Sequence, residues 1–187
     1  MTSKYIPITP HTRFRFKCLR CDKCCGTGPN VALTVFDIVR IARFLKIHWN
    51  EFLKNYTRVI IADMLPFVSL KGDEKGRCPF LSYKPNGETL CVIYPARPMR
   101  CRLYPIIVES VSPLRLYLDP KCPGIGEGSE VVIPLNDLKK YIKERREHYR
   151  LLYELIFVEG LEPLEALERA IERVWRTMDD DAASERS

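Results

Sequence analysis

The stretch Cys18-Leu19-Arg20-Cys21-Asp22-Lys23-Cys24-Cys25 places four cysteines within eight residues. Thiolates spaced two residues apart converge on one metal centre when the intervening loop curls and turns its backbone amides toward the sulfurs. Side chains of adjacent residues in an extended chain point to opposite sides, so we expect Cys24 and Cys25 not to bind one metal in the same way. This stretch therefore predicts a metal site with a separate role for Cys25.

Four more cysteines follow, and two of them precede a proline. They are Cys78, Cys91, Cys101 and Cys122, with the pairs Cys78-Pro79 and Cys122-Pro123. Eight thiols make either two four-ligand sites, or one four-iron cluster with additional structural or redox thiols. The crowding in the first cluster favours an iron–sulfur cluster, of the 4Fe–4S type, over structural zinc, whose ligands usually come as separated pairs. Zinc stays open as the alternative metal.

Two interpretations without a metal also exist. A disulfide framework is compatible with the cytosol of a hyperthermophile, and isolated cysteines can be buried as small apolar residues. The tight repeat at Cys18–Cys25 favours metal ligation over both.

Three other side chains are candidates for contact with the bound centre: Arg97, Arg102 and Tyr104. The two arginines flank Cys101 and either neutralise a thiolate-rich site or bind a carboxylate or phosphate. The sequence thus allows metal ions as partners, together with an anionic small molecule or a protein substrate. No catalytic residue is indicated, because no nucleophile triad, Walker loop or dinucleotide fingerprint is present.

Composition predicts a soluble globular chain of 187 residues, with 46% hydrophobic and 29% charged residues. Its apolar runs are too short to span a bilayer, and the N-terminus shows no secretory signal, so we expect a cytoplasmic protein without a membrane partner. The absence of Gln and the presence of only five Asn are typical of a thermophile. A net charge of +6 without a long basic run does not indicate nucleic-acid binding.

Periodicity predicts an α+β fold, in which a small cysteine-rich core of short strands and loops is wrapped by helices and followed by a C-terminal helical pair. We expect helices over 33–45, 49–56, from 134 onward and 163–178, a strand at 14–16, another at 66–70, and hairpins over 80–93 and 106–118. We also expect a cysteine-cluster domain at 1–128, and a helical extension with an acidic tail at 129–187 that packs on it.

Four motifs in order resemble the YkgJ-type cysteine cluster family, with its CxxCxxCC stretch. They are Cys18-x-x-Cys21-x-x-Cys24-Cys25, Cys78-Pro79-Phe80-Leu81, Cys91-x-Ile93-Tyr94-x-x-Arg97-Pro98-x-x-Cys101-Arg102-x-Tyr104-Pro105 and Cys122-x-Gly124-Ile125-Gly126. The resemblance covers residues 13–128 and implies zinc or iron chelation, in a family that is chiefly uncharacterised and often assigned as iron–sulfur oxidoreductases.

Three functions follow from the residues and the resemblance. The first is an iron–sulfur protein that is an oxidoreductase or supports a group-transfer reaction. The second is a zinc-stabilised binding module without catalysis. The third is a protein lysine methyltransferase-like enzyme, because a similar cysteine cluster occurs in flagellin lysine N-methylase.

Overall fold

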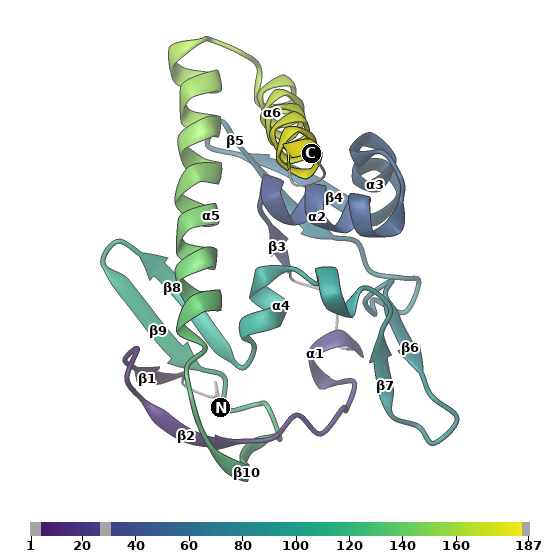
Figure 1. The fold of residues 1–187 in the computed structure, drawn as a ribbon, viewed down its shortest axis with the longest axis vertical. Helices are drawn as coiled ribbons and strands as arrows, with labels where there is room; N and C mark the ends of the chain where they lie inside the picture. The colour runs from purple at the N-terminus through teal and green to yellow at the C-terminus, as the bar shows by residue number, and fades with distance from the viewer. Residues whose placement is uncertain (1–4, 27–30, 185–187) are drawn as a thin grey trace. The chain divides into compact units, whose positions relative to one another are not determined.

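The computed structural model describes residues 5–26 and 31–184 and has a mixed α+β fold, as the sequence predicts. Two compact units make up the chain, and each is built from two separate segments (Figure 1). The first unit combines Met1–Pro29 with Gly72–Lys143, and the second combines Asn30–Lys71 with Glu144–Ser187. The predicted division into a cysteine-cluster domain at 1–128 and a helical extension at 129–187 stays a prediction.

The first unit consists mainly of short antiparallel strands. These form the sheets β1-β9-β8, β10-β2 and β6-β7. The strands are β1 (Ile6–Ile8), β2 (Arg13–Phe16), β6 (Leu81–Tyr83), β7 (Thr89–Cys91), β8 (Ile106–Val111), β9 (Leu114–Leu118) and β10 (Ile125–Val132). Its helical elements are α1 (Lys23–Gly26), η1 (Tyr94–Ala96), α4 (Met99–Leu103) and the start of α5 (Leu135–Tyr153).

The two predicted hairpins are confirmed, and turn chemistry explains the first of them. Gly87 has a φ of +82°, which an L side chain rarely adopts, and the Glu88 amide donates to the Asn86 side-chain oxygen at 3.1 Å. This turn joins β6 to β7. The second hairpin joins β8 to β9 across Ser112-Pro113.

A hydrophobic cluster holds one part of the first unit together. It is formed by Met99, Leu103, Ile106, Val108, Leu116, Leu118, Ile133, Leu138 and Tyr141. These residues come from α4, β8, β9, the segment before α5 and the start of α5. The members of the cluster do not include the loop 17–26 or the β6-β7 hairpin, so other interactions must fix those two segments.

The second unit packs helices with a three-stranded sheet of order β3-β5-β4. Its elements are β3 (Ala32–Leu33), α2 (Val35–Leu45), α3 (Trp49–Tyr56), β4 (Thr57–Ala62), β5 (Leu65–Leu70), the end of α5, a π-helical turn η2 (Glu154–Val158) and α6 (Pro163–Ser184). The predicted helices at 33–45 and 49–56 are confirmed, and Thr34 and Asp37 form a capping box at the start of α2. None of the helices in the described ranges is both long and apolar enough to cross a membrane.

Polar groups are buried beside α2 in the second unit. Arg40 forms salt bridges with Asp37, at 2.8 Å, and with Glu144, and all three side chains are at most 15% exposed. The Nδ1 atom of the buried His148 accepts a hydrogen bond from the Val35 amide at 3.4 Å. Burial lowers the pKa of His148 to about 4, so this ring stays neutral in the folded protein near neutral pH.

The neutral His148 makes stability depend on pH. Its pKa is about 6.5 in the unfolded chain and about 4 in the folded one, so below pH 6.5 protons bind preferentially to the unfolded state. We expect this group to reduce the free energy of unfolding by about 3 kcal/mol between pH 6.5 and pH 4. Urea denaturation at a series of pH values measures the loss. The loss should disappear in His148→Gln and persist in His11→Gln, which changes an exposed histidine.

Candidate metal centre

All eight cysteines lie in the first unit, and all are free thiols. Cys18, Cys21 and Cys24 are exposed, and the other five are partly buried. The structure therefore differs from a disulfide framework. It also differs from a set of fully buried apolar cysteines, because no cysteine among the described residues is fully buried.

Cys24 and Cys25 lie on the same side of the chain. Their sulfurs are 3.6 Å apart, so the expectation that the two side chains point to opposite sides is wrong. That expectation assumed an extended backbone, whereas both residues belong to the single turn α1. Consecutive residues are rotated by about 100° in a helix rather than by about 180° as in a strand.

The β6-β7 hairpin holds the N-terminal cysteine loop through its backbone. The Cys78 amide donates to the Cys25 carbonyl at 2.7 Å, and the Thr89 amide donates to the Arg20 carbonyl at 3.0 Å. The Thr89 hydroxyl also donates to the carbonyls of Arg20, at 2.9 Å, and Cys21, at 3.3 Å. Thr89 is a positioning residue that the sequence analysis missed, because only the pairing of distant segments reveals it.

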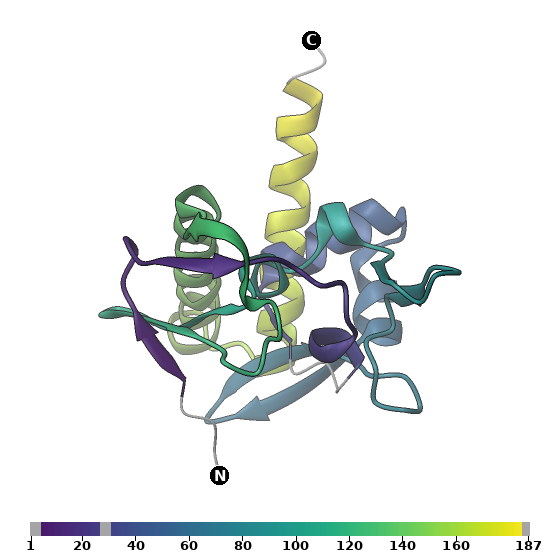
Figure 2. The ribbon, with the colours of Figure 1, turned by 90° about the horizontal axis from the view of Figure 1, so that it is seen from below.

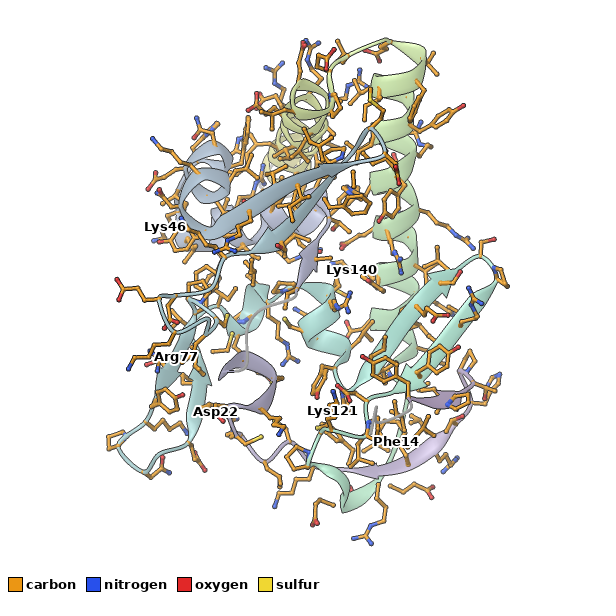
Figure 3. The ribbon with its side chains drawn as sticks, turned by 180° about the vertical axis from the view of Figure 1, so that it is seen from behind. Phe14, Asp22, Lys46, Arg77, Lys121 and Lys140 are labelled. Carbon is orange, nitrogen blue, oxygen red and sulfur yellow. The ribbon has the colours of Figure 1, made fainter. Side chains whose placement is uncertain are left out.

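The same loop has a further contact and one unusual backbone conformation. In Figure 3, Asp22 lies beside α1, and its carboxylate accepts a hydrogen bond from the Tyr83 hydroxyl at 3.3 Å. Arg20 has a φ of 49°, in the left-handed region.

The segment after Cys122 packs closely on the residue before Cys18. The Lys17 amide donates to the Gly124 carbonyl at 3.1 Å, and Ile125 is the antiparallel partner of Phe16. Figure 2 shows β2, in purple, beside β10, in green. A Cβ atom on Gly124 would lie 2.3 Å from the Lys17 carbonyl oxygen. The glycine at this position therefore permits a close approach of two backbones.

The two Cys-Pro pairs adopt the same local structure. The Leu81 amide donates to the Cys78 carbonyl at 3.1 Å, and the Ile125 amide donates to the Cys122 carbonyl at 3.2 Å. Each pair thus begins a four-residue turn with proline at its second position, where a fixed φ is favourable. The two turns present their cysteines in equivalent ways.

Backbone amides two residues after a cysteine donate to its sulfur at three positions. Burial raises the pKa of the Cys78, Cys91 and Cys122 thiols. In each case the amide two residues later donates to the sulfur and lowers the pKa in part. These amides belong to Phe80, Ile93 and Gly124. Such hydrogen bonds stabilise thiolates and are typical of cysteine ligands. The spacing of two residues could have identified these amides from the sequence.

Cys24 carries the most acidic thiol for which a shift is evident. The hydrogen bond with Cys25 lowers the pKa of Cys24 to about 7, with burial acting against it and the positive charge of Arg97 acting in the same direction. The same contact raises the pKa of Cys25. Burial raises the pKa of Cys91, and the positive charge of Arg97 opposes part of this rise. The Arg97 guanidinium therefore lies near two thiols.

The three predicted contact residues differ in their surroundings. Arg97 stacks at 4.2 Å on the Tyr94 ring, and its Nε atom is buried without a hydrogen-bond partner among the described residues. Arg102 donates to the Pro95 carbonyl at 2.8 Å. The Tyr104 hydroxyl donates to Asp119 at 3.3 Å, and burial raises the pKa of Tyr104. The Nε atom of Arg102 is likewise buried without a hydrogen-bond partner among the described residues, so both arginines have unused hydrogen-bonding capacity.

The donor set fits a metal bound by sulfur. Eight thiols, amide-to-sulfur hydrogen bonds at three of them and the buried Nε atoms of Arg97 and Arg102 without partners among the described residues provide ligands and positive charge for a thiolate centre. Within residues 5–26 and 31–184, however, no three Cys, His, Asp or Glu side chains are arranged to hold a metal ion. The predicted ligand set therefore stays a prediction.

The contact at Gly124 makes a testable prediction. Because the added methyl group would meet a backbone carbonyl, Gly124→Ala should cost about 1 to 3 kcal/mol of stability and weaken metal binding. Gly126→Ala is the control, since a Cβ there meets nothing within 4 Å and the cost comes only from a φ of +90°. Thermal unfolding and metal content measure both effects. Equal loss of metal in the two variants would contradict the role of the contact.

Comparison with known proteins agrees with this cysteine-rich site. The chain is 35% identical over 94 residues to "Uncharacterized protein MJ0661" of Methanocaldococcus jannaschii, and the match covers 50% of this chain and 46% of that protein. No solved structure matches. A family model described as "CxxCxxCC: Putative zinc- or iron-chelating domain" matches residues 17–123, which is more than half of the chain and includes all eight cysteines. The chain therefore belongs to the CxxCxxCC family of zinc- or iron-chelating domains.

Proposed function

We propose that this domain binds iron as a 4Fe–4S cluster and acts in electron transfer, as an oxidoreductase or in support of a group-transfer reaction. The observation that carries the proposal is the loop with Cys18, Cys21 and Cys24, whose thiols are exposed and regularly spaced. Three cysteines with this spacing, joined by a distant cysteine before a proline, are typical ligands of a cubane cluster. Cys122 is such a cysteine, and its segment contacts the residue that precedes Cys18.

The exposed loop also supports electron transfer. A cluster held by Cys18, Cys21 and Cys24 would lie close to the surface, where a redox partner can approach it. The first unit contains 17 Lys and Arg residues against 9 Asp and Glu residues. This excess of positive charge balances an anionic cluster and favours an anionic small molecule or an acidic protein surface as partner. We propose the cytoplasm as the location, because thiols stay reduced there.

Anaerobic purification tests the proposal. The protein should contain iron and acid-labile sulfide and absorb at about 400 nm, and dithionite should bleach this absorbance reversibly. A colourless protein with stoichiometric zinc and no redox couple would support a zinc-stabilised binding module in its place.

Arg97 should raise the reduction potential of the centre. Reduction adds a negative charge, which the nearby guanidinium favours, so Arg97→Met should lower the midpoint potential by on the order of tens of millivolts. Arg100→Met removes an equal charge from an exposed position and is the control. Redox titration monitored by visible absorbance measures both potentials. An unchanged potential in Arg97→Met would show that Arg97 does not act on the centre electrostatically.

A further inference from the structure

The three-stranded sheet of the second unit ends in an exposed apolar strand. Its order is β3-β5-β4, so β4 (Thr57–Ala62) is an edge strand, and β5 is its neighbour in the sheet (Figure 1). We infer that β4 pairs with β4 of a second copy of this chain, antiparallel and about a two-fold axis at Ile60. The sheets of the two copies then form one continuous sheet. This interaction involves no metal and goes beyond the proposed function.

Pro66 determines which backbone groups of β4 face the free edge. Opposite residues in an antiparallel pair alternate between those that exchange both hydrogen bonds and those that exchange none. Ile61 lies opposite Pro66, which has no N–H group, so these two residues are of the second kind. Val59 and Val68, two positions along, are of the same kind. The N–H and C=O groups of Val59 and Ile61 therefore point away from β5.

The free edge of β4 lacks the usual protection against further pairing. Within residues 5–26 and 31–184, no hydrogen bond joins the backbone of Val59 or Ile61 to another segment beyond the sheet. Natural edge strands are commonly protected by proline, by charged side chains or by a bulge. The stretch Thr57–Ala62 contains no proline, has Arg58 as its one charged residue, and pairs with β5 in continuous register. The edge can therefore accept another strand.

The side chains along this edge are apolar on both faces of the sheet. On one face, Ile60 is 61% exposed and lies opposite Phe67, which is also exposed. Ile61 is exposed on the other face, since side chains alternate along a strand. The solvated face of an antiparallel sheet normally carries polar residues. Pairing with a second apolar strand would remove part of this surface from water, which is favourable.

A two-fold axis at Ile60 suits a second copy in both backbone and charge. It places Val59 of each copy opposite Ile61 of the other, so that their outward N–H and C=O groups exchange hydrogen bonds in both directions. It also places Arg58 of each copy opposite Ala62 of the other, beside Asp63, and keeps the two arginines apart. Opposite charges thus meet at both ends of the paired strands, and like charges do not.

Overall charge and contact size set the strength of this association. The second unit contains 13 Lys and Arg residues and 15 Asp and Glu residues, so its nearly balanced charge does not oppose self-association. Stable complexes bury about 800 Å² on each partner, and a contact of one strand from each copy is smaller than this. We therefore expect a reversible dimer with a dissociation constant on the order of 10 μM.

Sedimentation equilibrium of the full-length protein tests for this dimer. The protein is used with its metal as purified, from about 1 μM to about 500 μM, a range that brackets the expected dissociation constant. A reductant excludes covalent links through the exposed cysteines. The mass should rise from 21.8 kDa toward twice this value. A monomer at every concentration would overturn the inference and leave a strand from a different protein as the candidate for this edge.

A lysine in β4 tests whether this strand forms the contact. Ile60→Lys places two like charges at the axis and should raise the dissociation constant about tenfold or more. Val158→Lys is the control, because Val158 is an equally apolar residue of the same unit that is 71% exposed and lies outside the sheet. Circular dichroism and metal content verify that both variants are folded. Equal weakening in the two variants, or an unaltered dimer in Ile60→Lys, would contradict the role of β4.

Hydrogen exchange at single-residue resolution tests the register of the paired strands. The amides of Val59 and Ile61 should become protected as the protein concentration rises. The Ile60 amide, which faces β5 in each copy, should be protected at every concentration and serves as the internal control. Mass spectrometry with electron-transfer fragmentation resolves these amides. A dimer without concentration-dependent protection at Val59 and Ile61 would show that the copies meet elsewhere and would overturn the inference.

Discussion

Removal of the metal is expected to open the N-terminal cysteine loop and the β6-β7 hairpin while the β1-β9-β8 sheet stays folded. The loop and the hairpin lie outside the hydrophobic cluster that includes residues of β8 and β9, and backbone hydrogen bonds such as that from Cys78 to Cys25 join them. Thiolate-bound metals contribute on the order of 10 kcal/mol to small metal-dependent domains. Hydrogen exchange measured by mass spectrometry reports the protection of the backbone amides in each segment. The measurement is made before and after the metal is removed with EDTA and ferricyanide.

The hydrophobic cluster provides the internal control for this experiment. Peptides from Ile106–Val111 and Leu114–Leu118 should keep their protection, while peptides containing residues 17–26 and 78–91 should exchange much faster. Uniform acceleration across both groups would show that the metal stabilises the whole unit. Unchanged exchange in the cysteine segments would show that no metal holds them.

Replacing Arg40 by methionine is expected to lower the free energy of unfolding by about 3 to 5 kcal/mol. Arg40 is the cation between Asp37 and Glu144, and its loss leaves two carboxylates buried close together without it. Urea denaturation at pH 7 measures the effect.

Arg150→Met is the matched control for Arg40→Met. Arg150 also contacts two carboxylates, Glu147 at 2.7 Å and Glu154 at 3.0 Å, but its side chain is 60% exposed. Exposed ion pairs contribute about 0 to 1 kcal/mol. An equal loss in the two variants would show that burial does not govern the Arg40 contacts.

Helices and hairpins were predictable because their signals are local. The capping box at Thr34 and Asp37 marks the start of α2, and Asn86-Gly87 marks the first hairpin. Strand β4 was missed because Thr57–Ala62 follows α3 directly, without a turn residue between them. Strand β10 was missed because its glycines resemble a loop, although its partner β2 was predicted.

The family and the eight cysteines followed from the sequence, whereas their surroundings did not. Hydrogen bonds from Thr89 to the N-terminal loop join residues about seventy positions apart, and no local pattern encodes them. The contact of Cys24 with Cys25 depends on one helical turn, which the spacing of the cysteines does not reveal. The interleaving of two segments in each unit likewise arises from long-range packing.

X-ray absorption at the edge of the bound metal, on anaerobically purified protein, tests the central claim that these thiols coordinate a metal. We predict a first shell made only of sulfur, at about 2.3 Å from the metal. A first shell of nitrogen or oxygen atoms, or protein that carries no stoichiometric metal, would contradict it.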